Sequence, residues 1–99
     1  MPLEREFQPR LIKMLESRFP GCFILKNDPN YRQGVPDLLL LYGRNWAILE
    51  VKRKPPKPSD YEPNQEWYIE QLNAMSFSAC VYPENAEEVL DALEQAFAA

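Results

Sequence analysis

The sequence predicts a single α/β domain whose elements follow the order α-β-β-β-α-β-α. Three observations indicate this fold class. Apolar residues recur at helical spacing in three segments, short apolar runs typical of strands fill four others, and Pro, Gly or Asn punctuate the junctions. At 99 residues the chain can bury one modest core, and it contains no internal repeat or domain boundary. Residues 1–99 are therefore expected to form one domain.

The first helix is expected over residues 3–18, because Phe7, Leu11, Met14 and Leu15 recur along one helical face. Pro9 fits a first helical turn but breaks a helix interior. The helix therefore either begins near Gln8 or bends at Pro9.

Three strands are expected next, over residues 22–26, 37–42 and 46–52. Nearly every residue of the second strand is apolar, so we expect both of its faces to be covered. Residues 43–45 read as a three-residue hairpin turn. Residues 53–63 contain four prolines and are expected to form an extended, exposed loop.

The second helix is expected over residues 64–76, and a last short strand over 77–82. The helix is predicted to carry Tyr68, Ile69, Leu72 and Met75 on one side. The final helix is expected to begin after Asn85, with Glu88 completing a variant of the capping box. Its apolar stripe, expected in the core or at a dimer surface, comprises Val89, Leu90, Leu93 and Phe97.

Composition excludes several kinds of protein. The chain has no His, which rules out a Ser-His-Asp triad, a Cys-His dyad and a His-ligated zinc. Its two cysteines form no CxxC unit and lie among apolar residues, so reduced thiols are expected. The N-terminus has no signal-peptide core, and the longest uniformly apolar run, 38–42, is too short to span a membrane. These features favour a cytoplasmic protein, in the host cytoplasm if the source is a phage.

Charge divides the chain into two unequal parts. The net charge is −4, which alone argues against binding to nucleic acid. Residues 1–58 nevertheless carry all eleven basic residues and a net charge of +5, whereas residues 59–99 carry nine acids and no base. We therefore expect a basic face and an acidic back formed by the last two helices. A solvated acidic helix face that merely balances the charge is an equally good reading.

The residues that point to chemistry are Gly34-Val35-Pro36-Asp37 and Glu50-Val51-Lys52. Alternation along a strand places Glu50 and Lys52 on one face. If Tyr42 pairs with Trp46, Asp37 lies level with Val51, on the other face from Glu50. A bulge in the turn, or an Asp37 that precedes regular pairing, would bring the two carboxylates together.

Two carboxylates, a backbone carbonyl and a lysine suit a hard metal ion. Mg²⁺ prefers oxygen ligands, binds through one or two carboxylates and keeps several waters. It lowers the pKa of a bound water and stabilises charge on a phosphate, and a lysine can support either role. A plain surface Glu-x-Lys ion pair is the competing interpretation, and the preceding Gly-x-Pro-Asp favours the metal site.

This arrangement resembles the PD-(D/E)XK nuclease superfamily and, within it, the VRR-NUC family. Members of that family read Gly-x-Pro-Asp, then a Glu-x-Lys strand, then a helix entered through a Gln, here Gln65. The likeness spans roughly residues 4–82, and the segment from Glu4 to Glu16 also resembles the first helix of Holliday-junction resolvases. It implies a restriction-endonuclease-like mixed sheet flanked by helices.

The resemblance also implies roles for individual residues. The catalytic core would be Asp37, Glu50 and Lys52, with Gln65 orienting the water or the metal shell. Metal ligands would be Asp37, Glu50, the carbonyl of Val51 and an early acid, for which Glu4 fits best and Glu6 competes. Phosphate contacts are expected from basic residues that flank the site in sequence, namely Lys26, Arg32, Arg53, Lys54 and Lys57.

The implied activity is Mg²⁺-dependent hydrolysis of DNA phosphodiester bonds, with Mn²⁺ able to take the place of Mg²⁺. A small member of the family resembles a symmetric dimer that cuts branched DNA such as a Holliday junction, and paired cuts need two sites related by a twofold axis. Two alternatives stay open: a nuclease of other specificity that nicks DNA or cleaves flaps, and a non-catalytic DNA-binding module on the same fold.

Overall fold

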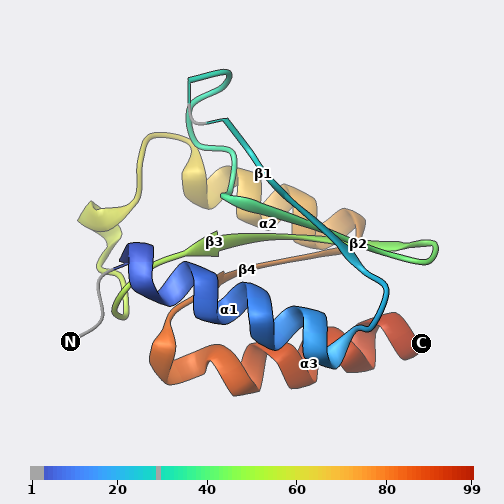
Figure 1. Ribbon diagram of the computed structural model, residues 1–99. Coiled ribbons are helices and arrows are strands. Elements are labelled where there is room, and N and C mark those ends of the chain that lie inside the picture. The colour runs from blue at the N-terminus through green and yellow to red at the C-terminus, as the bar shows by residue number, and fades with distance from the viewer. Residues whose placement is uncertain (1–3, 29) are drawn as a thin grey trace.

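The expected order of elements is confirmed in the structure, a computed structural model that describes residues 4–28 and 30–99 (Figure 1). Within the first helix, side chains are described from Phe7 onward. The elements are α1 (Glu4–Arg18), β1 (Phe23–Lys26), β2 (Leu38–Tyr42), β3 (Asn45–Val51), α2 (Gln65–Met75), β4 (Phe77–Val81) and α3 (Ala86–Ala98). Two short 3₁₀ turns, Pro58–Asp60 and Pro83–Asn85, precede α2 and α3.

The four strands form one mixed sheet in the order β1-β2-β3-β4. β1 and β2 pair antiparallel, as do β2 and β3, whereas β4 runs parallel to β3. A parallel pair needs a crossover connection, and α2 provides it. Helices α1 and α3 lie together on one face of the sheet, and α2 lies on the other (Figure 1).

The hydrophobic core lies between the sheet and the α1–α3 pair. It takes Phe7, Leu11 and Leu15 from α1, alternate residues of the strands, and the stripe of α3 that begins at Val89. The α3 stripe is thus core rather than a free surface: Val89, Leu90 and Leu93 are buried, and Phe97 packs against Phe19 and Tyr42.

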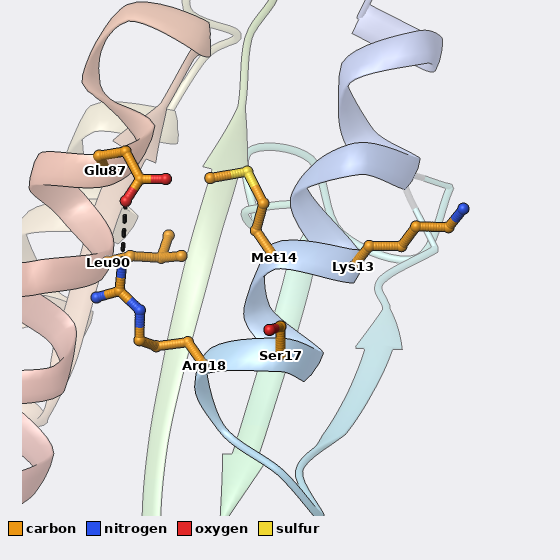
Figure 2. Close-up of a pocket in the computed structure, with 6 residues that line it drawn as sticks. All are labelled: Lys13, Met14, Ser17, Arg18, Glu87 and Leu90. Carbon is orange, nitrogen blue, oxygen red and sulfur yellow. Dashed lines mark hydrogen bonds and ion pairs between the residues drawn. The ribbon is translucent and has the colours of Figure 1, made fainter.

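Ion pairs join the exposed edges of α1 and α3. Arg18 lies 3.0 Å from a carboxylate oxygen of Glu87 and 2.8 Å from one of Asp91. Arg18 and Glu87 border a groove of about 480 Å³ between the two helices, where Met14 and Leu90 supply the apolar lining (Figure 2). The charge of Arg18 is already paired with acids of α3.

Helix α2 covers only part of its face of the sheet. It packs on β3 and β4, and the β1–β2 half of that face leaves Phe23, Leu25 and Leu41 exposed. The expectation that both faces of β2 are covered is therefore wrong for its α2-side face. On the apolar side of α2, Tyr68, Ile69 and Leu72 are half-buried, whereas Met75 is 71% exposed.

Two local expectations are also corrected. Helix α1 begins at Glu4 and runs through Pro9, so it does not begin near Gln8. Asn85 forms no capping box with Glu88. Its side chain accepts a hydrogen bond from the backbone of Tyr82 at 2.8 Å and donates to the carbonyl of Cys80 at 3.0 Å, so it secures the turn after β4 instead.

The arrangement of the helices also changes the expected charge pattern. Because α2 and α3 lie on opposite faces of the sheet, their acids do not form one acidic back (Figure 1). Across the described chain, no helix is long and apolar enough to cross a membrane.

Candidate active site

Asp37 and Glu50 meet because the β2–β3 hairpin has a two-residue turn. The ladder pairs Tyr42 with Asn45 and Leu38 with Leu49, so only Gly43 and Arg44 form the turn. The positive φ of 61° at Gly43 fits the first position of a type II′ turn. One further step in this register places Asp37 opposite Glu50, on the same face of the sheet. The expected three-residue turn is wrong, and no bulge is required.

The Asp37 carboxylate is held by the end of β3. Its Oδ2 accepts a hydrogen bond of 2.9 Å from the backbone amide of Val51, and its carboxyl group shares a hydrogen bond with Glu50. Burial raises the pKa of Asp37 above its ordinary value, although the amide of Val51, the charge of Lys52 and the bond with Glu50 all oppose the rise. The pair therefore forms a partly desolvated carboxyl couple.

Lys52 is held at three points. Its Nζ lies 3.3 Å from Oε2 of Glu50, donates to the carbonyl of Asp60 at 3.1 Å, and sits 5.8 Å from the ring centroid of Tyr61. The Glu50 residue is 2% exposed, so its ion pair with Lys52 is shielded from water. The ammonium group is thereby fixed beside the carboxyl couple.

The Pro-rich segment folds back over Lys52 instead of forming the expected extended loop. Pro58–Asp60 forms a 3₁₀ turn in which Oδ2 of Asp60 accepts a hydrogen bond from the amide of Lys57 at 2.8 Å. The next residue, Tyr61, is half-buried and forms a side-chain hydrogen bond with Cys80, and burial raises the pKa of its hydroxyl. The local sequence does not predict these contacts between distant residues.

Gln65 enters the site as the first residue of α2. It is 3% exposed, and its Oε1 accepts a hydrogen bond from the amide of Glu62 at 3.2 Å. Asn64, just before it, adopts a left-handed φ of 71°, and the turn that contains it packs against the backbone of Gly34. The Gly-x-Pro-Asp segment and the start of α2 are thus fitted to each other.

These side chains surround a cavity of about 130 Å³. Its lining includes Asp37, Glu50, Lys52 and Gln65, which are the predicted catalytic residues whose side chains the structure describes. The predicted DNA contact Arg32 also lines it. The lining is Asn27, Arg32, Gly34, Val35, Asp37, Glu50, Lys52, Glu62 and Gln65. Sequence reasoning missed Asn27 and Glu62. Asn27, which donates to the carbonyl of Pro36 at 2.6 Å, follows β1 in a polar cluster and could have been suspected.

The other predicted DNA contacts lie outside this cavity. Arg53 and Lys54 line a neighbouring hollow of about 210 Å³ together with Lys52, Pro56 and Asp60. Lys57 is exposed on the same segment, whereas Lys26 is exposed and pairs with Leu38 across the β1–β2 ladder. The side chains of Glu4 and Glu6 lie outside the described residues.

The donor set fits a divalent cation that keeps part of its water shell. Among the side chains that the structure describes, no group of three or more Asp, Glu or Cys residues could hold a metal. Asp37 and Glu50 nevertheless provide two carboxyl groups in contact, and Mg²⁺ commonly binds through only one or two. The amide of Val51 points to Asp37, and the carbonyl of an extended residue points to the same side as its amide. Val51 can therefore contribute a third oxygen.

Comparison with known proteins supports the fold. A scan of family models finds no match, and a search of curated proteins finds no similar sequence. A solved structure described as "VRR_NUC domain" is similar to this chain, with a TM-score of 0.61 and 22% sequence identity. The match covers 91% of this chain and 97% of that one, so the two share their whole architecture.

Proposed function

We propose that this chain is a metal-dependent DNA endonuclease of the VRR-NUC type. The observation that carries the proposal is the register that sets Asp37 opposite Glu50, with Lys52 beside them and Gln65 on the same cavity. A fold shared with a VRR_NUC domain structure agrees with it. Binding alone would not require a carboxyl couple and a half-buried lysine paired with a buried Glu50 at one point, which disfavours a non-catalytic module.

Asp37, Glu50 and the carbonyl of Val51 would hold Mg²⁺, or Mn²⁺ in its place. When bound, the cation would lower the pKa of a water and stabilise negative charge on the phosphate. Lys52, held by Glu50 and the Asp60 carbonyl, would donate a hydrogen bond to the attacking water or to the developing charge. Gln65 would orient the same water, and Glu4 or Glu6 would complete the acidic set.

The DNA backbone would pass from Arg32 at the cavity to Arg53, Lys54 and Lys57 on the Pro-rich segment, with Lys26 as a peripheral contact. Such contacts set affinity and register without reading bases. We further propose preference for branched DNA such as a Holliday junction, cut by a homodimer because two strands need two sites. We also propose that the protein acts in a reducing compartment such as the cytoplasm, since its two cysteines are free thiols and half-buried.

Incubation with labelled DNA substrates tests this function. A four-way junction, a flap and a linear duplex are each mixed with the protein and either Mg²⁺ or EDTA. We expect cleavage that needs the cation and is fastest on the junction. Folded protein that cleaves none of the substrates would refute the nuclease, cutting faster on the flap would favour the repair-type alternative, and equal cutting of linear duplex would refute the branch preference. Light scattering at micromolar concentration tests the dimer, which a monomer mass would contradict.

A further inference from the structure

Two large aromatic side chains that are close in sequence to cavity residues are exposed to solvent. Tyr31, on the loop before β2, is 80% exposed, and Trp67, in the first turn of α2, is 57% exposed. Each is a near neighbour in sequence of a residue that lines the cavity, Arg32 and Gln65 respectively. An exposed aromatic side chain offers a flat apolar face on which another ring can stack.

The two rings belong to one connected set of side chains. The guanidinium carbon of Arg32 lies 5.7 Å from the ring centroid of Tyr31, and the same group hydrogen bonds to the hydroxyl of Tyr68. The ring of Tyr68 in turn meets that of Trp67 edge to face, with centroids 5.1 Å apart. Arg32, which lines the cavity, therefore links Tyr31 on the loop before β2 to Tyr68 and Trp67 on α2.

The four aromatic residues near the site divide into two kinds. Tyr61 packs beneath Lys52 and bonds to Cys80, and the hydroxyl of half-buried Tyr68 holds Arg32, so both serve internal contacts. Tyr31 and Trp67 keep most of their surface free. These two rings are therefore the ones that can stack on a ligand.

Charge indicates what kind of ligand fits. Trp67 shares α2 with the exposed acids Glu66 and Glu70, which repel a phosphate backbone. Arg32, which lines the cavity, supplies positive charge next to the ring of Tyr31. A strand whose phosphate lies at the cavity would thus turn its base, not its backbone, toward these rings. Every nucleobase has a π-face that stacks on an aromatic ring.

We propose that Tyr31 and Trp67, with Arg32 between them, form a subsite for an unpaired nucleobase next to the phosphate that is cut. This subsite rests on the proposed nuclease function and deepens it. A base in a continuous duplex is stacked on its neighbours and cannot reach the rings. A base at a branch point or in a single strand is free to do so, which gives the enzyme a physical means of preferring branched DNA.

Tryptophan fluorescence provides the test, since Trp67 can be made the sole emitter by the substitution Trp46→Phe. The protein is titrated with a ten-nucleotide oligo(dT) and with a blunt ten-base-pair duplex, in EDTA to prevent cleavage. We expect the oligonucleotide to quench Trp67 strongly and the duplex to change its emission little. In anisotropy titrations of labelled oligonucleotide, Tyr31→Leu and Trp67→Leu should each weaken binding about tenfold, and duplex affinity should stay within about twofold.

Met75→Ala is the matched control, because Met75 is a large apolar residue on α2 whose 71% exposure lies between those of Trp67 and Tyr31, and it lies outside the connected set. It should leave both affinities unchanged. Equal losses for oligonucleotide and duplex in the Tyr31 and Trp67 variants would overturn the subsite while leaving the nuclease intact. Trp67 emission that changes with protein concentration in the absence of DNA would assign the rings to an interface between copies. If neither DNA binds to folded protein, both the subsite and the nuclease proposal fail.

Discussion

Gly34 lies so close to Pro63 that a side chain cannot fit between them. A Cβ atom at Gly34 would stand 2.6 Å from the carbonyl oxygen of Pro63, and Gly34 has a φ of +94°, which favours glycine. This contact joins the segment that carries Asp37 to the turn that carries Gln65. The glycine of the Gly-x-Pro-Asp motif thus serves the assembly of the site rather than its chemistry.

Replacement of Gly34 by alanine should therefore lower the free energy of unfolding by more than the strain of a positive φ alone would. Gly21 is the matched control, since its φ is +89° and nothing lies within 4 Å of a Cβ there. We expect Gly21→Ala to lower the free energy of unfolding by about 1 kcal/mol and Gly34→Ala by about 3 kcal/mol. Urea denaturation measures both. Equal losses would show that the close approach to Pro63 has no energetic weight.

Lys52→Ala should abolish cleavage while leaving DNA binding largely intact. Loss of a donor that acts on developing charge commonly lowers a rate a hundredfold or more. Single-turnover cleavage and anisotropy measure the two effects, and circular dichroism checks the fold. Lys13→Ala, an exposed lysine at the α1–α3 groove, is the control and should behave as wild type. Retained cleavage in Lys52→Ala would remove this residue from the mechanism.

Tyr61 should act on the reaction through its ring, because the ring lies against the Lys52 ammonium group. We expect Tyr61→Ala to lower kcat about tenfold with KM within a few-fold of wild type, since Lys52 would lose one of its three supports. Tyr61→Phe keeps the ring and should be close to wild type in kcat. If the two variants lose the same activity, the hydrogen bond to Cys80 matters and the ring does not.

Mg²⁺ should stabilise the folded protein in the absence of DNA. At ten times its dissociation constant the cation would add about 1.4 kcal/mol, which raises the Tm of a domain of this size by roughly 5 °C or more. Asp37→Asn and Glu50→Gln should each abolish the shift, whereas Glu84→Gln, on the turn before α3, should keep it. Differential scanning fluorimetry measures this. A shift that survives in both site variants would place the cation elsewhere.

The raised pKa of Asp37 makes stability depend on pH in the metal-free protein. The folded state binds the proton more tightly than the unfolded chain, so the benefit is complete below the unfolded pKa, near 3.8, and is lost as pH rises through the folded pKa. We expect the free energy of unfolding to fall across this window, and the fall to be smaller in Asp37→Asn. Urea titrations from pH 4 to 8 in EDTA measure it. If the difference between the wild-type and Asp37→Asn curves rises with pH instead, the pKa of Asp37 is lowered rather than raised.

Local patterns in the sequence were enough to predict the seven elements, since periodicity and Pro, Gly or Asn at the junctions act over a few residues. The Gly-x-Pro-Asp and Glu-x-Lys motifs predicted that Asp37, Glu50 and Lys52 meet at one end of the hairpin, and the family resemblance added Gln65. All four line one cavity. Their mutual geometry depended on one residue in a turn. With Gly43 and Arg44 alone in the turn, Asp37 faces Glu50, whereas a third turn residue would have turned it away.

Contacts between distant segments were decided only by the tertiary structure. The crossing of α2 to the face opposite α3 divides the acids, which one-dimensional charge counting had placed together. The return of Asp60 and Tyr61 onto Lys52 depends on packing across the sheet. So does the division of four aromatic residues into two that are half-buried and two that are exposed. The sequence by itself determined which chemical groups are present and which helices, strands and turns carry them. Folding decided which of them touch, because register and helix placement depend on non-local burial that no local pattern encodes.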